Sequence, residues 1–178
     1  MQFLYLNKLR SINLVISDVD GVLTDGKLLV GPSGEHLKNF NVKDGLGIKL
    51  LQKNNIKVVF MSGGESKATE SRANQLGVKY CLTNVRDKKI ALKNLQKETN
   101  IPINQTLFIG DDINDLVVKP YVKILACTKD ANKVLKNHSN LKLKSIGGNG
   151  AFRELTELIL KSKGLFKDLE KGFTQANN

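Results

Sequence analysis

Short apolar runs alternate with segments of helical periodicity along most of this sequence. The runs are rich in Val, Ile and Leu, and the segments between them repeat apolar residues at helical spacing. The pattern predicts strands over residues 12–17, 56–62, 78–82, 106–110 and 122–127. It predicts helices over residues 44–55, 65–77, 87–100, 114–120, 130–137 and 151–164. Strands this apolar must be covered on both faces, so we expect an α/β fold with a doubly wound, Rossmann-like parallel sheet.

Residues 26–41 interrupt this alternation. The turn-forming sequence GPSG (31–34) stands between two short runs, a pattern typical of a β-hairpin. The hairpin follows the first strand, so it is expected to lie over the edge of the sheet where that strand ends. The length of 178 residues fits a single domain, 1–178, with this hairpin as a flap and with a C-terminal tail and helix at 147–178.

The chain carries a formal net charge of +11 at pH 7. A basic protein can bind nucleic acid or a membrane surface, or it can simply favour small anionic ligands. The lysines are scattered along the whole chain, with no dense basic block and no aromatic RNA-binding motif. We therefore expect a small anionic ligand, and neither nucleic acid nor a membrane as a partner.

The cysteines and the N-terminus indicate a compartment. Cys81 and Cys127 lie far apart without CxxC spacing, which favours two reduced thiols packed as small apolar groups. The first residues have basic side chains within their apolar stretch rather than ahead of it, unlike a secretory signal. No uncharged run approaches the length of a membrane span. These features predict a protein of the reducing cytoplasm.

Acidic residues follow two of the predicted strands. Asp18 and Asp20 come after the first strand, and Asp111 and Asp112 come directly after strand 106–110. Ligands of open α/β sheets bind outside the carboxyl ends of the strands, so both clusters could meet at one edge. Carboxylates so close together need a neutralising cation, and oxygen ligands favour Mg²⁺. Asp20 or Asp112 alone could equally be a helix cap or an Asx turn, but two clusters at two strand ends favour a metal site.

Two further features carry less information by themselves. Ser62-Gly63-Gly64 lies between a strand and a helix, where a hydroxyl and free amides can bind an anion or can simply cap the helix. Lys88 opens a helix, where the dipole disfavours a cation; a bound phosphate would explain it, and so would a solvated surface position. The sequence has neither a Walker A motif nor GxGxxG, which argues against nucleotide binding by those routes.

Together these segments resemble the motifs of the haloacid dehalogenase superfamily of phosphotransferases, in the right order and over nearly the whole chain. The segments are DVDGVLTDG (18–26), SGG (62–64), Lys88 and GDDIND (110–115). The resemblance implies that Asp18 is the nucleophile that forms an aspartyl-phosphate. It also implies that Asp20 protonates the leaving oxygen and then activates water. Mg²⁺ would be bound by the Asp18 side chain, the Asp20 backbone carbonyl and Asp111.

The same resemblance implies roles for the remaining motif residues. Ser62 and the amide of Gly63 would hold the phosphoryl oxygens, and Lys88 would neutralise their charge. Asp112 and Asp115 would orient the metal's waters or brace Lys88. The acidic residues at the two strand ends would therefore be tolerated because a metal ion and a phosphate ester balance their charge.

Two closer features are similar to one subgroup, the octulosonate 8-phosphate phosphatases and their relatives that act on nonulosonate 9-phosphates. These features are FNVKDGLGIKLL (40–51) and GGNGAFRE (147–154), the latter followed by an amphipathic helix. Members lack a large cap domain, assemble as tetramers through their hairpins, and can cover a neighbour's active site with the C-terminal segment. The resemblance implies a homotetramer in which Arg153, from an adjacent subunit, and less strongly Arg72 contact the substrate.

The implied function is Mg²⁺-dependent hydrolysis of the phosphate monoester of a 3-deoxy-2-keto sugar acid. The best single substrate is 3-deoxy-D-manno-octulosonate 8-phosphate, which feeds lipopolysaccharide biosynthesis. Gly64 stands where octulosonate phosphatases commonly carry arginine and nonulosonate phosphatases can carry glutamate, so a side chain used in sugar discrimination is missing. The alternative substrate is a sialic-acid-like nonulosonate 9-phosphate. A module that binds phosphate and metal without turnover is a further alternative. The pair Asp18 and Asp20 argues against it, because binding alone does not need the second acid.

Overall fold

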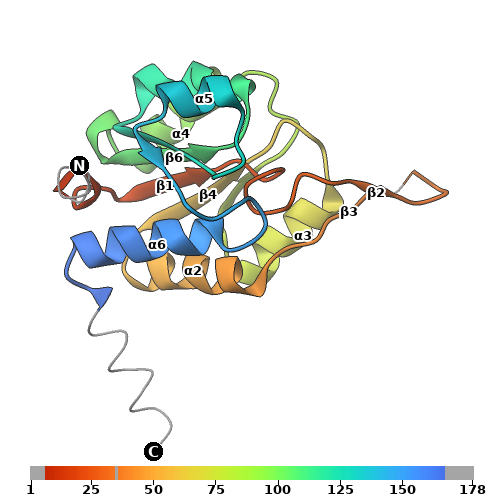
Figure 1. Cartoon of the computed structure of the whole chain (residues 1–178), viewed down its shortest axis with the longest axis horizontal. Coiled ribbons are helices and arrows are strands. Elements are labelled where there is room, and N and C mark those ends of the chain that lie inside the picture. Colours follow the sequence, from red (N-terminus) through yellow and green to blue (C-terminus); the bar gives the residue numbers. More distant parts are fainter. Residues whose placement is uncertain (1–6, 35, 167–178) are drawn as a thin grey trace, which may run out of the picture.

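The computed structural model describes residues 7–34 and 36–166, and it centres on a six-stranded parallel sheet (Figure 1). The strand order is β5-β4-β1-β6-β7-β8, and every neighbouring pair runs parallel. The strands are β1 (Leu14–Ser17), β4 (Lys57–Met61), β5 (Tyr80–Leu82), β6 (Thr106–Gly110), β7 (Ile124–Cys127) and β8 (Leu141–Lys142). This order, which places the first strand at the centre, confirms the doubly wound, Rossmann-like prediction.

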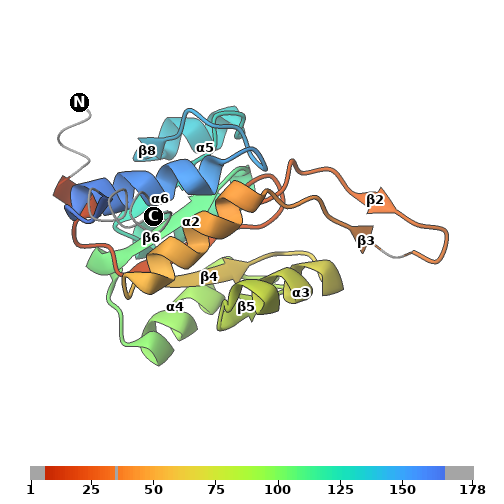
Figure 2. The ribbon, with the colours of Figure 1, turned by 90° about the horizontal axis from the view of Figure 1, so that it is seen from below.

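Helices cover both faces of the sheet, as Figures 1 and 2 show. One face packs against α2 (Val42–Lys53), α3 (Lys67–Leu76) and α6 (Ala151–Ser162). The other packs against α4 (Lys88–Thr99), the 3₁₀ helix η2 (Ile113–Tyr121) and α5 (Lys133–His138). A 3₁₀ turn, η1 (Ile103–Gln105), leads into β6. None of the helices in the described residues is long and apolar enough to cross a membrane.

The central strand β1 illustrates why the sequence requires two layers of helices. Leu14 and Ile16 belong to the hydrophobic cluster on one face of the sheet, and Val15 belongs to the cluster on the other. All three are fully buried. Because successive side chains of a strand point to opposite faces, a run of consecutive apolar residues must be covered twice.

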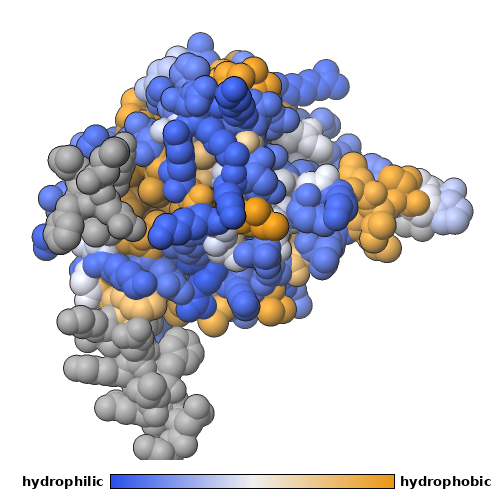
Figure 3. Space-filling view, in the orientation of Figure 1, coloured by the Kyte–Doolittle hydropathy of each residue, from blue (hydrophilic) through white to orange (hydrophobic). Residues whose placement is uncertain are grey.

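A hairpin projects from the body of the molecule after β1, as predicted for residues 26–41 (Figures 1 and 2). Its strands β2 (Leu29–Val30) and β3 (His36–Leu37) are antiparallel and are joined by a turn in which the Gly34 amide donates to the Gly31 carbonyl. Four of its large apolar side chains are more than half exposed: Leu28, Leu29, Val30 and Leu37. They form the hydrophobic part of the projection in Figure 3. Apart from this hairpin, the described residues include no domain inserted between the strands of the sheet.

Some predicted elements differ from the observed ones. The helix expected to stop at Pro120 is a 3₁₀ helix that includes Pro120 and ends one residue later, at Tyr121. Proline fits such a position because its fixed φ is helical and only one hydrogen bond is lost. The short edge strand β8 was not predicted. The C-terminal segment expected at 147–178 is described as far as residue 166, and its remainder lies outside the described residues.

Candidate active site

Most of the predicted site residues converge where the direction of the strand order reverses. From β1 the chain proceeds to β4 and β5 on one side and then returns to β6 on the other, so β1 and β6 form the switch point. A cleft of about 370 Å³ lies at this edge of the sheet. It is lined by Asp18, Asp20, Gly26, Ser62, Gly63, Gly64, Lys88, Asp111, Asp112 and Asn114. Open α/β sheets bind ligands in such a crevice, outside the carboxyl ends of the strands.

Three carboxylates crowd together at the base of this cleft. Oxygen atoms of Asp18, Asp111 and Asp115 lie within 4.8 Å of one another, and Asp115 is completely buried. Burial, followed by the charge of Asp115, raises the pKa of Asp18 to about 6, although Lys88 opposes this shift. Burial and the neighbouring carboxylates, Asp18 first, raise the pKa of Asp111 to about 8. The cluster therefore needs positive charge or bound protons.

Two glycines allow these carboxylates to approach so closely. Gly21 has φ +79°, and a Cβ at this position would collide with the Asp111 carboxylate. A Cβ at Gly110 would collide in the same way with the carboxylate of Asp115. The glycines of the two acidic motifs thus provide room for acidic side chains from neighbouring segments.

Lys88 is the cation nearest to the cluster. Its Nζ lies 2.6 Å from Asp115 Oδ1 and 3.1 Å from Asp18 Oδ1, and its side chain is 5% exposed. Burial acts to lower the pKa of Lys88, but the charges of Asp18 and Asp115 more than offset this and raise it. The other oxygen of Asp115 accepts the Asp111 amide at 3.1 Å. The alternative that Lys88 is a solvated surface lysine is therefore wrong, and Asp115 braces it.

Ser62, Gly63 and Gly64 form the wall contributed by the end of β4. The Ser62 amide donates to the Leu82 carbonyl at 2.8 Å, and the Ser62 hydroxyl accepts the Gly64 amide at 3.2 Å. Helix α3 begins at Lys67 with Ser66 as its N-cap, so the alternative that Ser62 caps this helix is wrong. Gly63 is exposed towards the cleft.

Asp20 and Asp112 are held by different partners. Both oxygens of Asp20 lie 2.8 Å from Nζ of Lys38, a hairpin lysine that no motif singled out. Asp112 is exposed and accepts the Ile113 amide at 2.7 Å, which makes it the N-cap of η2. For Asp112, the helix-cap interpretation left open by the sequence is thus the one observed.

The two arginines expected to contact substrate do not line the cleft in this chain. Arg72 donates to Gln75 at 2.6 Å, and its guanidinium lies 5.8 Å from the centre of the Phe40 ring. Arg153, in the first turn of α6, donates to Glu157 at 2.9 Å. The structure therefore groups the other predicted site residues without these two.

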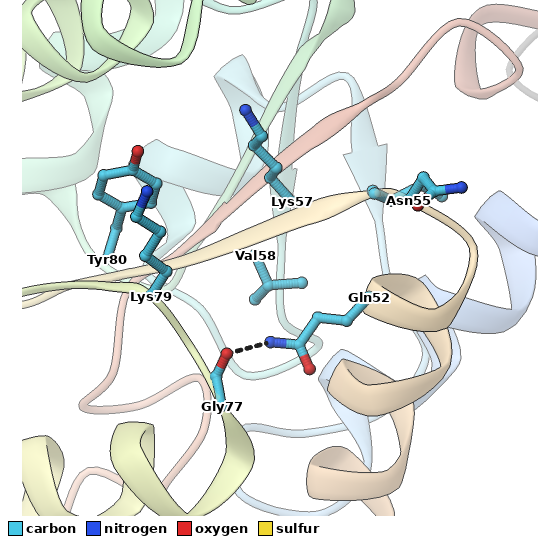
Figure 4. A pocket seen from close by; sticks show the side chains of 8 residues that line it. Gln52, Asn55, Lys57, Val58, Gly77, Lys79 and Tyr80 are labelled. Atoms are coloured by element: carbon cyan, nitrogen blue, oxygen red, sulfur yellow. Dashed lines mark hydrogen bonds between the residues drawn. The ribbon is translucent and has the colours of Figure 1, made fainter.

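A second hollow, of about 390 Å³, lies beside the starts of β4 and β5 (Figure 4). It contains Lys57, Lys79 and Tyr80, and the Gln52 amide donates to the Gly77 carbonyl at 3.0 Å across it. None of the described residues that line it is acidic. It therefore offers no carboxylate for metal binding or proton transfer, and the acidic cleft remains the candidate site.

Comparisons with known proteins agree with this geometry. A family model for haloacid dehalogenase-like hydrolases matches residues 83–155. The 3-deoxy-D-manno-octulosonate 8-phosphate phosphatase of Haemophilus influenzae is 39% identical over 171 residues, which cover 95% of each chain. Its cobalt-bound structure has a TM-score of 0.86 to this chain at 40% identity, covering 88% of this chain and 92% of that one. The Moraxella catarrhalis phosphatase, solved with magnesium, phosphate and KDO, has a TM-score of 0.91 at 32% identity, covering 94% and 97%.

The family-model match and these relatives place the chain among the haloacid dehalogenase-like hydrolases. Two of the compared proteins are phosphatases that match this chain over most of its length. The chain belongs to the family of 3-deoxy-D-manno-octulosonate 8-phosphate phosphatases within that class. This confirms the family that the sequence motifs indicated.

Proposed function

We propose that this protein is a Mg²⁺-dependent phosphatase of a 3-deoxy-2-keto sugar acid, with 3-deoxy-D-manno-octulosonate 8-phosphate as its first-choice substrate. The observation that carries the proposal is the cleft at the switch point, where Asp18, Asp20, Lys88 and Asp111 face one space. The named activity of the Haemophilus influenzae relative supports the choice of substrate. The sugar acid released by this protein would serve lipopolysaccharide biosynthesis.

In the proposed reaction, a carboxylate oxygen of Asp18 attacks phosphorus while the bond from phosphorus to the sugar oxygen breaks. Asp20 gives a proton to the departing sugar oxygen. Asp20 then accepts a proton from the water that attacks the phosphoaspartate, which releases phosphate and restores Asp18. Ser62 and the Gly63 amide bind the phosphoryl oxygens, and Lys88 offsets their charge. Asp115 holds Lys88, and Asp112 and Asp115 would orient the waters of a bound metal.

The donor set of the cleft suits magnesium. The clustered atoms are all carboxylate oxygens, and burial, followed by their mutual repulsion, raises the pKa of both Asp18 and Asp111. The side chains of Asp18 and Asp111 and the backbone carbonyl of Asp20 would hold the ion. Bound Mg²⁺ would supply positive charge to the phosphoryl oxygens as they pass through the transition state.

A nonulosonate 9-phosphate is the second candidate substrate, and Gly64 is the observation that favours it. Gly64 lines the cleft, and a Cβ there would meet only ordinary contacts, 3.8 Å from the Ser62 hydroxyl and 3.9 Å from Asp20 Oδ2. A side chain would fit, so its absence leaves room beside the phosphate site for a longer sugar. Arg153 from a neighbouring subunit, and Arg72 with a smaller contribution, would bind the sugar carboxylate.

We further propose a cytoplasmic homotetramer built from single-domain chains (1–178), with the hairpin at 26–41 as flap and the tail at 147–178 reaching a neighbour. The exposed apolar side chains of the hairpin support the assembly. Both cysteines are free thiols, in keeping with a reducing compartment.

A phosphate-release screen with Mg²⁺ tests the function and separates the two substrates. The panel contains octulosonate 8-phosphate, a nonulosonate 9-phosphate and ordinary hexose phosphates. The first should show the highest kcat/KM; a preference for the nonulosonate would select the alternative, and a preference for a hexose phosphate would contradict both. Asp20→Asn should abolish turnover while Mg²⁺ binding persists. A wild-type protein without turnover on any member would instead support the binding module.

A further inference from the structure

A buried lysine of the hairpin contacts the proposed acid-base residue. Lys38 follows β3, and its side chain is only 2% exposed although its neighbour Leu37 is 61% exposed. Its Nζ lies 2.8 Å from both carboxylate oxygens of Asp20. A buried ammonium requires a partner, and Asp20 supplies one.

Asp20 has little else to fix its side chain. The Ser62 hydroxyl is 3.5 Å from Asp20 Oδ2, at the limit of a hydrogen bond. The Asp20 side chain is 34% exposed and lines the cleft, although both of its oxygens contact Lys38. Lys38 does not line the cleft itself, which separates it from the groups expected to touch the substrate.

The same hairpin offers an ion pair of the opposite character. Lys27 lies 3.3 Å from Asp25, and the two side chains are 83% and 41% exposed. Such exposed pairs contribute little to stability or to orientation. The contrast shows that the Lys38–Asp20 pair is a buried arrangement rather than the ordinary behaviour of a lysine in this loop.

We propose that Lys38 is a positioning residue, which holds the Asp20 carboxyl group in the orientation that delivers a proton to the leaving oxygen. This inference rests on the proposed function. The proton moves from Asp20 to the sugar oxygen as that oxygen leaves phosphorus and Asp18 takes its place, and Lys38 keeps its own protons throughout. The hairpin is then part of the catalytic apparatus, because its docking fixes the acid.

Leaving-group dependence distinguishes this role from a merely structural one. A sugar oxygen must be protonated as it leaves, whereas nitrophenolate leaves without a proton. Rapid-quench and stopped-flow measurements give the rate of phosphoryl transfer to Asp18 for a sugar phosphate and for p-nitrophenyl phosphate. Lys38→Met should slow the first by about 100-fold and the second by less than about threefold, because only the first needs the acid. Lys27→Met is the matched control and should change neither rate.

The outcomes separate this inference from the proposed function. An equal loss on both substrates, or no loss on either, would contradict the positioning role. If thermal denaturation shows that Lys38→Met is unfolded, Lys38→Arg is the second variant. It keeps the positive charge but moves its position, and it should show the same dependence on the leaving group more weakly. The comparison holds for whichever sugar phosphate the wild-type protein prefers. Failure of the octulosonate substrate alone would therefore leave the test of Lys38 intact.

Discussion

At the scale of single residues, the cleft holds carboxylates that destabilise one another. Asp18 and Asp111 have pKa values raised to about 6 and about 8, chiefly by burial and then by neighbouring acids. Lys88 offsets part of this charge through its contacts with Asp18 and Asp115. A divalent cation would remove the remaining repulsion, so metal binding and proton release should be linked.

The stability of the metal-free protein should fall as pH rises. A carboxyl group with a raised pKa binds more protons in the folded state than in the unfolded state, so its ionisation favours unfolding. The loss should begin above the ordinary value of 3.8 and continue through about 6 for Asp18 and about 8 for Asp111. Urea denaturation in the presence of a chelator, repeated across this pH range, measures the free energy of unfolding. Added Mg²⁺ should restore stability most at the alkaline end of the range. Asp111→Asn should make the stability of the metal-free protein depend less on pH. A stability of the metal-free wild-type protein that rises with pH would contradict the prediction.

Replacing Gly21 should weaken metal binding through a clash rather than through backbone strain alone. Gly21→Ala places a methyl group against the Asp111 carboxylate, at φ +79°. Gly34→Ala is the matched control, because its φ is +81° and a Cβ there meets nothing within 4 Å. Calorimetry should show Mg²⁺ affinity reduced by about tenfold or more for Gly21→Ala and unchanged for Gly34→Ala. Equal affinities for the two variants would argue against the role of Gly21.

The sequence predicted the residues that lie close to strand ends. Asp18, Ser62 and Asp111 could be placed because parallel strands bring their carboxyl ends to one edge. Lys38 could not, because its contact with Asp20 depends on how the hairpin folds back. The burial of Asp115 beneath Lys88 likewise depends on the three-dimensional path of η2.

At the scale of elements, one helix is capped by another. The N-cap of helix α6 is Gly150, which has φ +87° and no side chain to accept the first amides. The carboxylate of Asp44, on α2, takes the place of a cap side chain. It accepts hydrogen bonds from the amides of Gly150 at 3.2 Å and Arg153 at 2.7 Å. The preceding Gly148 amide donates to the Val22 carbonyl at 2.9 Å. Asp44 thus anchors the start of α6 to α2, and Gly148 joins the segment before α6 to the loop that carries Asp20.

Asp44→Ala should destabilise the protein by about 1–3 kcal/mol, because it leaves two partly buried amides without an acceptor. Asp44→Asn keeps one acceptor oxygen and should lose less. Asn132→Ala removes an exposed cap of α5 and serves as the control, with a loss of about 0.5–1 kcal/mol. Chemical denaturation measures all three. A loss for Asp44→Ala no larger than the control's would mean that the bridge between α2 and α6 contributes little.

The type of most elements could be predicted, but their ends and edges could not. Helix α3 closes at Gly77, with φ +69°, as the sequence indicated. The strand β8 has two residues, Leu141 and Lys142, too few for any periodicity to appear. It forms because the chain runs beside β7. Because β8 is defined by its pairing with β7, the local sequence alone does not predict it.

At the scale of the whole molecule, the hairpin is an apolar projection in which Leu29, Val30 and Leu37 are each more than 60% exposed (Figures 2 and 3). A two-stranded ribbon is marginally stable alone in water, and these strands are only two residues long each. Association of hairpins from several copies would bury Leu29, Val30 and Leu37. This reasoning supports the proposed tetramer.

Charges on the hairpin should dissociate the assembly. In the double variant, Leu29→Glu and Leu37→Glu replace a directly opposed pair of apolar side chains. Sedimentation velocity should show a tetramer for the wild-type protein and a monomer for the variant. Ile103→Glu, at an apolar residue of η1 that is 45% exposed, should remain tetrameric. A double variant that sediments like the wild-type protein would exclude the hairpin as the site of assembly.

The most direct test of the account is to trap the phosphoryl group on the enzyme. Asp20→Asn, mixed with Mg²⁺ and p-nitrophenyl phosphate, whose leaving group needs no proton, and then quenched in acid, should carry one phosphoryl group that peptide mass spectrometry locates on Asp18. We expect this adduct in Asp20→Asn and none in Asp18→Asn. Rapid turnover by Asp18→Asn, or an adduct on another residue, would contradict the claim that Asp18 attacks phosphorus.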